Sequence, residues 1–411
     1  MTNLGLQLSS KFEGIPISEI LINLTNYSKI NNLKLLSFLL RDNIVNLGLF
    51  FMPHLAPERT PKQGQEFILD TIKKADELGY SEAWIGEHFA CGWEPVPAPD
   101  LLIAQALVQT NQIKLAPGAH VLPYHHPVEL AHRIAYLDHL AQGRYMVGIG
   151  AGSVPMDADL LGSIRYEEDG TETMLNAEMT QEALDIMIKV WTADEAFDYN
   201  GKFWQFKRRD YDDFEKGPFL KPFQTPHPPL GMTGISASSR TLTLAGKLGY
   251  RPMSFCIGPG YLAGHWDAYE AEADKAGHDV SREDWAVSPP FFVADTDEEA
   301  IEIVSGGEAG RFWEEYMIPG ILRRGLAKYS KVDPSHTDDM ITPEYLARNI
   351  WLVGSPETVA EKTANLIRET GGFGTLIGMC FDFIDQYDAW MHNLDLMKNE
   401  VMPRLENALA A

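Results

Sequence analysis

Apolar residues recur along the chain in two alternating patterns that begin at Val45. Residues 46–51 form a short and almost continuous apolar run, which is typical of a strand buried on both faces. The segment that follows carries apolar residues at helical spacing, with Thr60-Pro61 as a start signal and Gly79 as a stop signal. This succession repeats toward the end of the chain, so the pattern predicts strands and helices in alternation.

Eight strands can be counted in this way. The predicted strands cover residues 46–51, 82–86, 113–118, 145–149, 230–233, 250–255, 287–294 and 375–380. The later predicted helices cover residues 99–109, 127–141, 172–191, 236–248, 261–276, 357–370 and 384–409. Alternation of this kind predicts a parallel sheet with right-handed crossovers. A count of eight favours a closed (β/α)8 TIM barrel over an open doubly wound sheet.

Two long insertions interrupt the alternation, one after strand 4 and one after strand 7. They run from about residue 150 to 228 and from about residue 305 to 342. Both would lie at the carboxyl ends of the strands, where the active sites of such barrels are found. We expect the first insertion to cover the substrate as a lid. Its aromatic stretch at residues 197–206 suggests an apolar pocket, although ordinary packing would explain these side chains equally well.

Residues 1–44 differ from the rest, because they are rich in Asn, Ile, Leu and Ser and precede the first strand signal. We treat them as an N-terminal extension of unknown role and residues 45–411 as one barrel domain.

Charge and cysteine content exclude several classes of protein. The chain has 34 Lys and Arg against 58 Asp and Glu, a net charge of −24, which disfavours nucleic acid and anionic membranes as partners. It has neither a membrane-spanning apolar run nor a signal-peptide pattern. Cys91, Cys256 and Cys380 are far apart, which argues against disulfides and zinc sites. These features together indicate a cytoplasmic protein.

Candidate chemistry lies at the predicted strand ends. His88 follows strand 2 and titrates near neutral pH; a lone histidine is more often structural, but this position favours catalysis. Ser236, among small residues after strand 5, can cap the next helix, and the backbone there could bind a phosphate. Residues 148–152 read G-x-G-x-G, which departs from the dinucleotide fingerprint, and no short helix is expected at once. The glycines indicate either close approach to a flat ligand or tight packing at the rim.

Histidine spacing argues against a metal centre. His125 and His126 precede Pro127, so helix capping is their expected role. Neither H-x-H nor H-E-x-x-H occurs, which disfavours a metal-dependent barrel hydrolase. We therefore expect no metal ligands.

Several stretches, taken in order, resemble the bacterial luciferase-like monooxygenase family over nearly the whole barrel. They are A-W-I-G-E-H-F at Ala83, V-L-P-Y-H-H-P at Val121, L-D-H-L-A-Q-G-R-Y at Leu137, I-S-A-S-S at Ile235, V-G-S-P-E-T-V at Val353 and V-M-P-R-L at Val401. Each is modestly specific alone, and their shared order makes chance agreement improbable. Val45 falls where homologues have their initiator methionine.

The resemblance implies a TIM barrel that binds reduced FMN at the carboxyl ends of its strands. It implies that His88 is the catalytic histidine and that the Gly118–Ala119 peptide is cis and faces the flavin ring. The cofactor-binding residues implied in the same way are Gly118, Ala119, Gly150, Ala151, Gly152, Ser153, Ile235, Ser236, Ser239 and Met253. There is one departure, since luciferase has a phosphate-binding arginine at the position of Ala151. FMN is therefore expected to bind loosely.

The activity implied is a monooxygenase that uses reduced FMN and O₂ to oxygenate a small apolar molecule, with terpenes as the nearest substrates within the family. A separate flavin reductase would supply the reduced flavin, and family habit suggests a homodimer. One alternative is a dehydrogenase or reductase of the same fold that uses coenzyme F420. Another is a non-catalytic flavin-binding relative.

Overall fold

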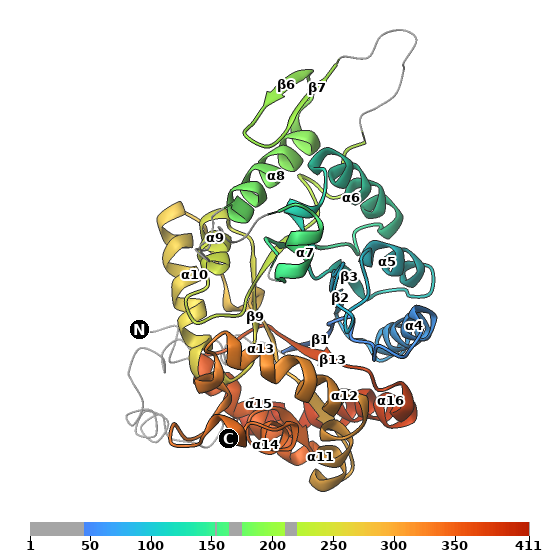
Figure 1. The fold of residues 1–411 in the computed structure, drawn as a ribbon, viewed down its shortest axis with the longest axis vertical. Helices are drawn as coiled ribbons and strands as arrows, with labels where there is room; N and C mark the ends of the chain where they lie inside the picture. Colours follow the sequence, from blue (N-terminus) through green and yellow to red (C-terminus); the bar gives the residue numbers. More distant parts are fainter. Residues whose placement is uncertain (1–44, 153, 164–174, 210–219, 411) are drawn as a thin grey trace, which may run out of the picture.

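The computed structural model describes residues 45–152, 154–163, 175–209 and 220–410. Parallel strands form a barrel at its centre, and helices pack around the outside (Figure 1). The barrel strands are β1 (Asn46–Phe51), β2 (Glu82–Ile85), β3 (Lys114–Pro117), β4 (His120–Val121), β5 (Val147–Gly150), β8 (Leu230–Gly234), β9 (Arg251–Phe255), β10 (Ala286–Ser288) and β13 (Thr375–Cys380). Their order in the sheet is β3-β2-β1-β13-β10-β9-β8-β5-β4.

The sheet closes between its two ends. β3 and β4 are consecutive pieces of one barrel strand, because only Gly118 and Ala119 separate them. The Leu115 backbone N–H donates to the Arg144 carbonyl at 2.8 Å, and the Met146 N–H donates to the Leu115 carbonyl at 3.0 Å. These bonds join β3 to the segment that leads into β5. The nine strands therefore occupy eight positions, and the expected TIM barrel is confirmed.

A ring of helices covers the barrel. Its members include α4 (Pro61–Glu77), α5 (Pro99–Leu107), α6 (Pro127–Ala141), α8 (Leu175–Thr192), α9 (Arg240–Leu248), α10 (Leu262–Ala276), α15 (Pro356–Thr370), α16 (Tyr387–Leu396) and α17 (Met402–Ala410). Thr60 begins α4 through a capping box, in which its side chain accepts from the Gln63 N–H and the Gln63 side chain accepts from the Thr60 N–H. The start signal read at Thr60-Pro61 is confirmed.

Strand residues alternate between the barrel interior and the helix layer. The inner cluster consists of Phe50, Trp84, Ala116, Met146, Met253, Ala286 and Ile377. At the amino-terminal end of the barrel, Arg251 donates to Glu82 Oε1 at 2.8 Å and to Thr375 Oγ1 at 2.9 Å. The first residues of β2, β9 and β13 are thus joined in one polar network at the end of the barrel opposite the mouth.

The prediction of one seventh strand over residues 287–294 is wrong. The chain forms β10 and then β11 (Phe291–Val293), separated by Pro289 and Pro290. Because proline has no backbone N–H, it interrupts the hydrogen-bond ladder. β11 leaves the barrel sheet and pairs in parallel with β12 (Leu352–Gly354), a strand that the apolar pattern did not predict.

The aromatic stretch of the first insertion folds into an antiparallel hairpin of β6 (Phe197–Asn200) and β7 (Gln205–Arg208). Figure 1 shows this hairpin at the periphery, beyond α8. Tyr199 stacks on Phe206 with ring centroids 5.4 Å apart, and Lys189 Nζ of α8 lies 4.3 Å from the Phe197 ring centroid. Of the two explanations for this stretch, ordinary packing is confirmed, because these side chains pack on one another and on α8. The lid role of the whole insertion stays a prediction.

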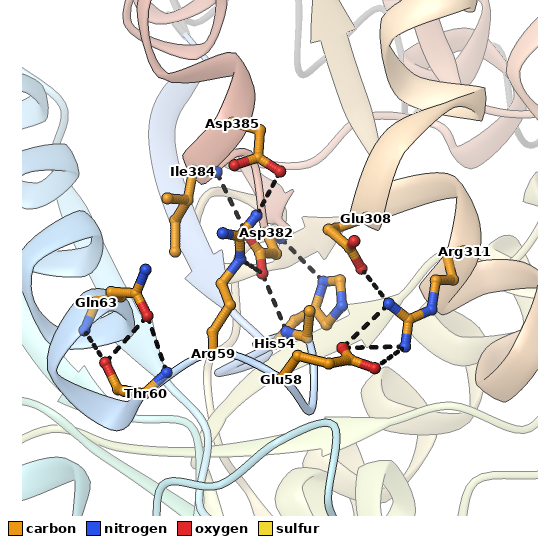
Figure 2. Close-up of polar contacts among 11 residues, drawn as sticks. His54, Glu58, Arg59, Thr60, Gln63, Glu308, Arg311, Asp382, Ile384 and Asp385 are labelled. Carbon is orange, nitrogen blue, oxygen red and sulfur yellow. Dashed lines mark hydrogen bonds and ion pairs between the residues drawn. The ribbon is translucent and has the colours of Figure 1, made fainter.

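The second insertion is helical. It includes α12 (Gly307–Phe312), the π-helical turn η5 (Trp313–Met317) and α13 (Ile318–Arg323), after α11 (Asp297–Ser305) and before α14 (Pro343–Asn349). Two sets of contacts join this insertion to the loop after β1. Figure 2 shows Arg311 of α12 paired with Glu58, with a closest approach of 2.8 Å.

The loop after β1 is also fixed to the end of β13. Arg59 donates to Asp382 at 2.7 Å, and the Asp382 backbone N–H donates to His54 Nδ1 at 2.9 Å (Figure 2). The ring of His54 stacks on Phe312 with centroids 3.8 Å apart. The second insertion is therefore anchored beside the barrel mouth.

Two expectations about the whole chain concern its helices and thiols. Among the described residues, no helix combines the length and apolar character needed to cross a bilayer. All three cysteines are free, as their spacing suggested, and the structure shows that all three are buried.

Candidate functional site

Small residues line one side of the barrel mouth, at the ends of β3 and β5. We call them the glycine shelf: Gly118, Ala119, Gly150, Ala151 and Gly152. Each is only partly buried, whereas the strand residues before them are buried. The Gly118–Ala119 peptide is cis, as the resemblance implied. A Cβ at Gly150 would meet nothing closer than Ala119 Cβ at 3.4 Å, so there is room beside this member of the shelf.

Deeper in the same strand, Gly148 serves packing. A Cβ there would overlap the Pro117 carbonyl oxygen and lie 3.2 Å from the Trp84 ring. The packing interpretation is confirmed for Gly148, and close approach to a flat ligand at Gly150 stays a prediction. A short helix, α7 (Pro155–Leu160), follows the run, so the expectation that no short helix follows at once is wrong.

His88 lies just after β2 with 21% of its side chain exposed. Its Nδ1 is 3.1 Å from Oδ2 of Asp157, which is carried by α7. The other Asp157 oxygen accepts from the Phe89 and Ala90 backbone N–H groups at 3.0 and 2.5 Å. Because an ionised carboxylate only accepts hydrogen bonds, Nδ1 of His88 carries a proton. Nε2 is then the nitrogen at which His88 gains or loses a proton.

Opposing effects set the charge of His88. Burial disfavours its charged form, but the carboxylates of Glu94, Asp157 and Glu87 favour it, and the net effect raises the pKa of His88. Glu94 Oε2 lies 3.7 Å from His88 Nε2. Burial would also raise the pKa of Asp157, but hydrogen bonds from His88 and the two backbone N–H groups lower it. A histidine held in this way can donate a proton from Nε2 near neutral pH.

Glu87 gathers three donors from β4 and the turn after it. His120 Nδ1 and His125 Nε2 each lie 2.8 Å from a Glu87 oxygen, and the Val121 N–H donates at 3.2 Å. Burial opposes ionisation of Glu87, yet the bonds from the two histidines lower its pKa to about 2. The capping role expected for His125 is wrong, and His126 at the start of α6 makes no side-chain capping bond.

Glu87 and its two histidine partners could also be read as a metal site. Within the described ranges they are the one group of potential ligands whose donor atoms lie within 4.8 Å of one another: Glu87, His120 and His125. Their N–O separations of 2.8 Å are hydrogen-bond distances. Ligands of a tetrahedral ion with bonds of about 2.0–2.2 Å would lie roughly 3.4 Å apart. Hydrogen bonding to an ionised Glu87 therefore accounts for the cluster, and the expectation of no metal ligands stays a prediction.

The segment after β8 differs in one respect from the sequence reading. Ser239, not Ser236, caps α9, because its side chain accepts from the Leu242 N–H at 3.3 Å. The Ser236 carbonyl accepts from His265 Nε2 at 2.6 Å. Ile235 and Ser236 are partly buried, so this segment borders the mouth.

The remaining predicted cofactor residues are Met253 and Ser153. Met253 is 3% exposed and belongs to the inner cluster, below the rim. Phe255, two residues later, is partly buried and contacts Phe50 edge-on with centroids 4.8 Å apart. Ser153 lies outside the described residues.

The sequence reading missed Asp157 and Glu94. Asp157 stands in an insertion without helical or strand periodicity long enough to place it, and Glu94 lies in the loop after His88. The sequence offers one sign of such partners, an acidic residue close to a strand-end histidine. Acidic residues are abundant in this chain, so that sign does not single out Asp157 or Glu94.

Comparison with known proteins agrees with this geometry. Residues 45–373 match the family described as luciferase-like monooxygenase. The chain is 37% identical over 374 residues to 3,6-diketocamphane 1,6-monooxygenase of Pseudomonas putida, covering 87% of this chain and 97% of that protein. It is 28% identical to limonene 1,2-monooxygenase of Rhodococcus erythropolis, over 89% of this chain and 88% of the relative.

Solved structures give the same result. The oxygenating constituent of 3,6-diketocamphane monooxygenase from Pseudomonas putida, a type II Baeyer–Villiger monooxygenase in complex with FMN, superposes with a TM-score of 0.80 at 37% identity, covering 88% of this chain and 98% of that one. A coenzyme F420-dependent secondary alcohol dehydrogenase shares the fold, with a TM-score of 0.61 at 19% identity over 88% and 99% of the two chains. By sequence and by fold, this chain belongs to the luciferase-like monooxygenase family.

Proposed function

We propose that this protein is the oxygenase component of a two-component, FMN-dependent monooxygenase that acts on a compact apolar ketone. The observation that carries the proposal is the pairing of His88 and Asp157 at the mouth of the barrel that also carries the glycine shelf. The similarity to diketocamphane monooxygenases and to a type II Baeyer–Villiger enzyme supports the ketone.

The residues at the mouth fit a flavin. The glycine shelf would accept one face of the flavin ring, since a Cβ at Gly150 would project into the room above Ala119. The segment of Ile235, Ser236 and Ser239 would hold the phosphate through backbone N–H groups and the start of α9. Ala151 contributes no charge there, which suits a reduced flavin that arrives from a reductase and leaves again. Reduced FMN, when bound, supplies the activation of O₂.

The protein's own contribution is to bind, orient and protonate. Asp157 fixes the His88 ring through Nδ1, which leaves Nε2 to hold or release a proton at the reacting oxygen. Phe255 of β9 and Met52 after β1, both partly buried, provide apolar surface at the mouth. Apolar walls exclude water from a reaction in which water would compete.

Labelled oxygen tests the proposal directly. The protein is incubated with reductase-generated reduced FMN, ¹⁸O-labelled O₂ and a camphor-derived bicyclic diketone. Mass spectrometry should find a lactone that carries one ¹⁸O atom, and His88→Ala should greatly reduce its yield. Product formation without oxygen from reduced coenzyme F420 would contradict the proposal and favour the dehydrogenase alternative.

We also propose a homodimer through the outer faces of α5 and α6. Three large apolar side chains of these helices, and that of Val108 directly after α5, are more than half exposed; the helix residues are Leu101, Tyr136 and Leu140. Burial of such a patch against its copy would be favourable. Light scattering should give twice the chain mass, and Leu140→Glu should shift the protein toward monomer. A cytoplasmic location accords with the three free, buried thiols.

A further inference from the structure

Glu94 lies beside His88 and makes an unusual set of contacts for a buried carboxylate. The residue is 2% exposed. Its Oε2 atom lies 3.7 Å from His88 Nε2, accepts a hydrogen bond from Tyr316 Oη at 3.1 Å, and is 3.5 Å from Cys91 Sγ. Three donors thus converge on one oxygen of Glu94.

The donors show which partner can exchange a proton. Burial, followed by the charge of Glu94, raises the pKa of Cys91 to about 11. Burial and Glu94 also raise the pKa of Tyr316 well above its usual range. Both groups therefore stay protonated near neutral pH and act as fixed donors. His88 is the one member of this set that titrates in the physiological range.

Tyr316 comes from a distant part of the chain. It lies in the π-helical turn η5 of the second insertion, where a wider turn interrupts the helical run from α12 to α13. Phe312, one turn earlier, stacks on His54 and lies 5.3 Å from the Tyr316 ring. The insertion is thus anchored to the loop after β1, which fixes where the Tyr316 hydroxyl points.

We propose that Glu94 is a positioning residue for His88, and that Tyr316 fixes the carboxylate of Glu94, so that the second insertion controls how His88 holds its proton. The proposal rests on the proposed catalytic role of His88. Glu94 favours the imidazolium form, while its distance of 3.7 Å leaves the Nε2 proton without a close acceptor. When that proton moves to the reacting oxygen, His88 becomes neutral. Its other proton stays on Nδ1, which continues to donate a hydrogen bond to Asp157. A proton from water then restores the imidazolium.

The charged groups around His88 are few and can be separated. Asp157 of α7 contacts Nδ1, Glu94 faces Nε2, and Glu87 acts from the preceding position. Only Glu94 is connected to the second insertion among these three. A carboxylate within about 4–6 Å shifts a neighbouring pKa by roughly one to three units. Loss of the Glu94 charge should therefore lower the His88 midpoint by at least about one pH unit.

The test is an NMR titration of the flavin-free protein with ¹⁵N-labelled histidine, in which His88→Gln identifies the His88 signals. Glu94→Gln should lower the midpoint, and Glu94→Asp, which keeps the charge, should retain most of the wild-type value. Tyr316→Phe should change the midpoint in the wild-type background but not in Glu94→Gln, because it acts only through Glu94. Tyr345→Phe is the matched control, because the wild-type hydroxyl lies 2.8 Å from His336 Nδ1 and Tyr345 is in α14, after the second insertion. This variant should leave the His88 midpoint unchanged.

Two results would overturn the inference. An unchanged His88 midpoint in Glu94→Gln would remove Glu94 from the role, and an equal effect of Tyr316→Phe in both backgrounds would remove Tyr316. If Glu94→Gln fails to fold, Tyr316→Phe in the wild-type background still decides the question, since an unmoved His88 midpoint in that variant contradicts the coupling. Because the measurement needs neither flavin nor substrate, its outcome is independent of the reaction proposed above.

Discussion

Two alanine substitutions on β5 separate the structural glycine from the glycine that we propose faces the flavin. A Cβ at Gly148 would overlap the Pro117 carbonyl and lie 3.2 Å from the Trp84 ring. Overpacking of this kind costs about 1–3 kcal/mol, so Gly148→Ala should lower the free energy of unfolding by about 2 kcal/mol. A Cβ at Gly150 would lie 3.4 Å from Ala119, an ordinary contact, so Gly150→Ala should change that free energy by less than about 1 kcal/mol.

The effect on flavin should be the reverse. The methyl group of Gly150→Ala would occupy the face of the glycine shelf, and a penalty of about 1.4 kcal/mol weakens binding about tenfold. Gly150→Val, with two more carbons, should weaken binding further. Urea denaturation followed by tryptophan fluorescence measures stability, and anaerobic titration with reduced FMN measures affinity. Wild-type affinity in both Gly150 variants would refute the assignment of the shelf, and an undiminished stability of Gly148→Ala would refute the packing argument.

Three further outcomes are expected. His88→Ala should lower turnover by about 10²- to 10⁴-fold while FMN titration still shows binding; turnover near the wild-type rate would contradict a general acid role. Because the Glu87 pKa is lowered from 4.5 to about 2, its ionisation stabilises the fold above pH 4.5 by about 3 kcal/mol, and this is lost as pH falls toward 2. Glu87→Gln should therefore reduce the change in the free energy of unfolding with pH in that window. Denaturation curves at pH 5 and pH 3 measure this change, and the same change in the variant as in the wild type would contradict the reasoning. Arg251→Met removes the cationic partner of buried Glu82, which should lower the free energy of unfolding in urea by about 3–5 kcal/mol. A loss below about 1 kcal/mol would show the ion pair to be dispensable.

Local pattern was sufficient for most of the barrel. β1 and β13 have the predicted bounds, and the start of α4 follows from Thr60 and its capping partner Gln63. These features depend on residues within a few positions of one another. The division of the seventh strand was missed, although Pro289-Pro290 is visible in the sequence, because an apolar run does not say which neighbour each half will pair with.

The lid illustrates a different limit. Aromatic side chains at residues 197–206 are compatible with a pocket or with packing, and the sequence pattern left both open. The hairpin β6–β7 packs on α8, so the insertion between Gly150 and β8 projects its aromatic part outward (Figure 1). The direction in which an insertion leaves the barrel depends on helix packing, which sequence periodicity does not encode.

By itself the sequence determined the barrel, the strand-end position of His88 and the small residues of the glycine shelf, because periodicity and residue size are local properties. Only the tertiary structure decided which partners surround His88. Asp157 comes from 69 positions away, and Tyr316 contacts Glu94 across a separation of 222. Charge and proton position at a site depend on distances of a few ångströms between such remote residues, and those distances exist only once the chain has closed into a barrel.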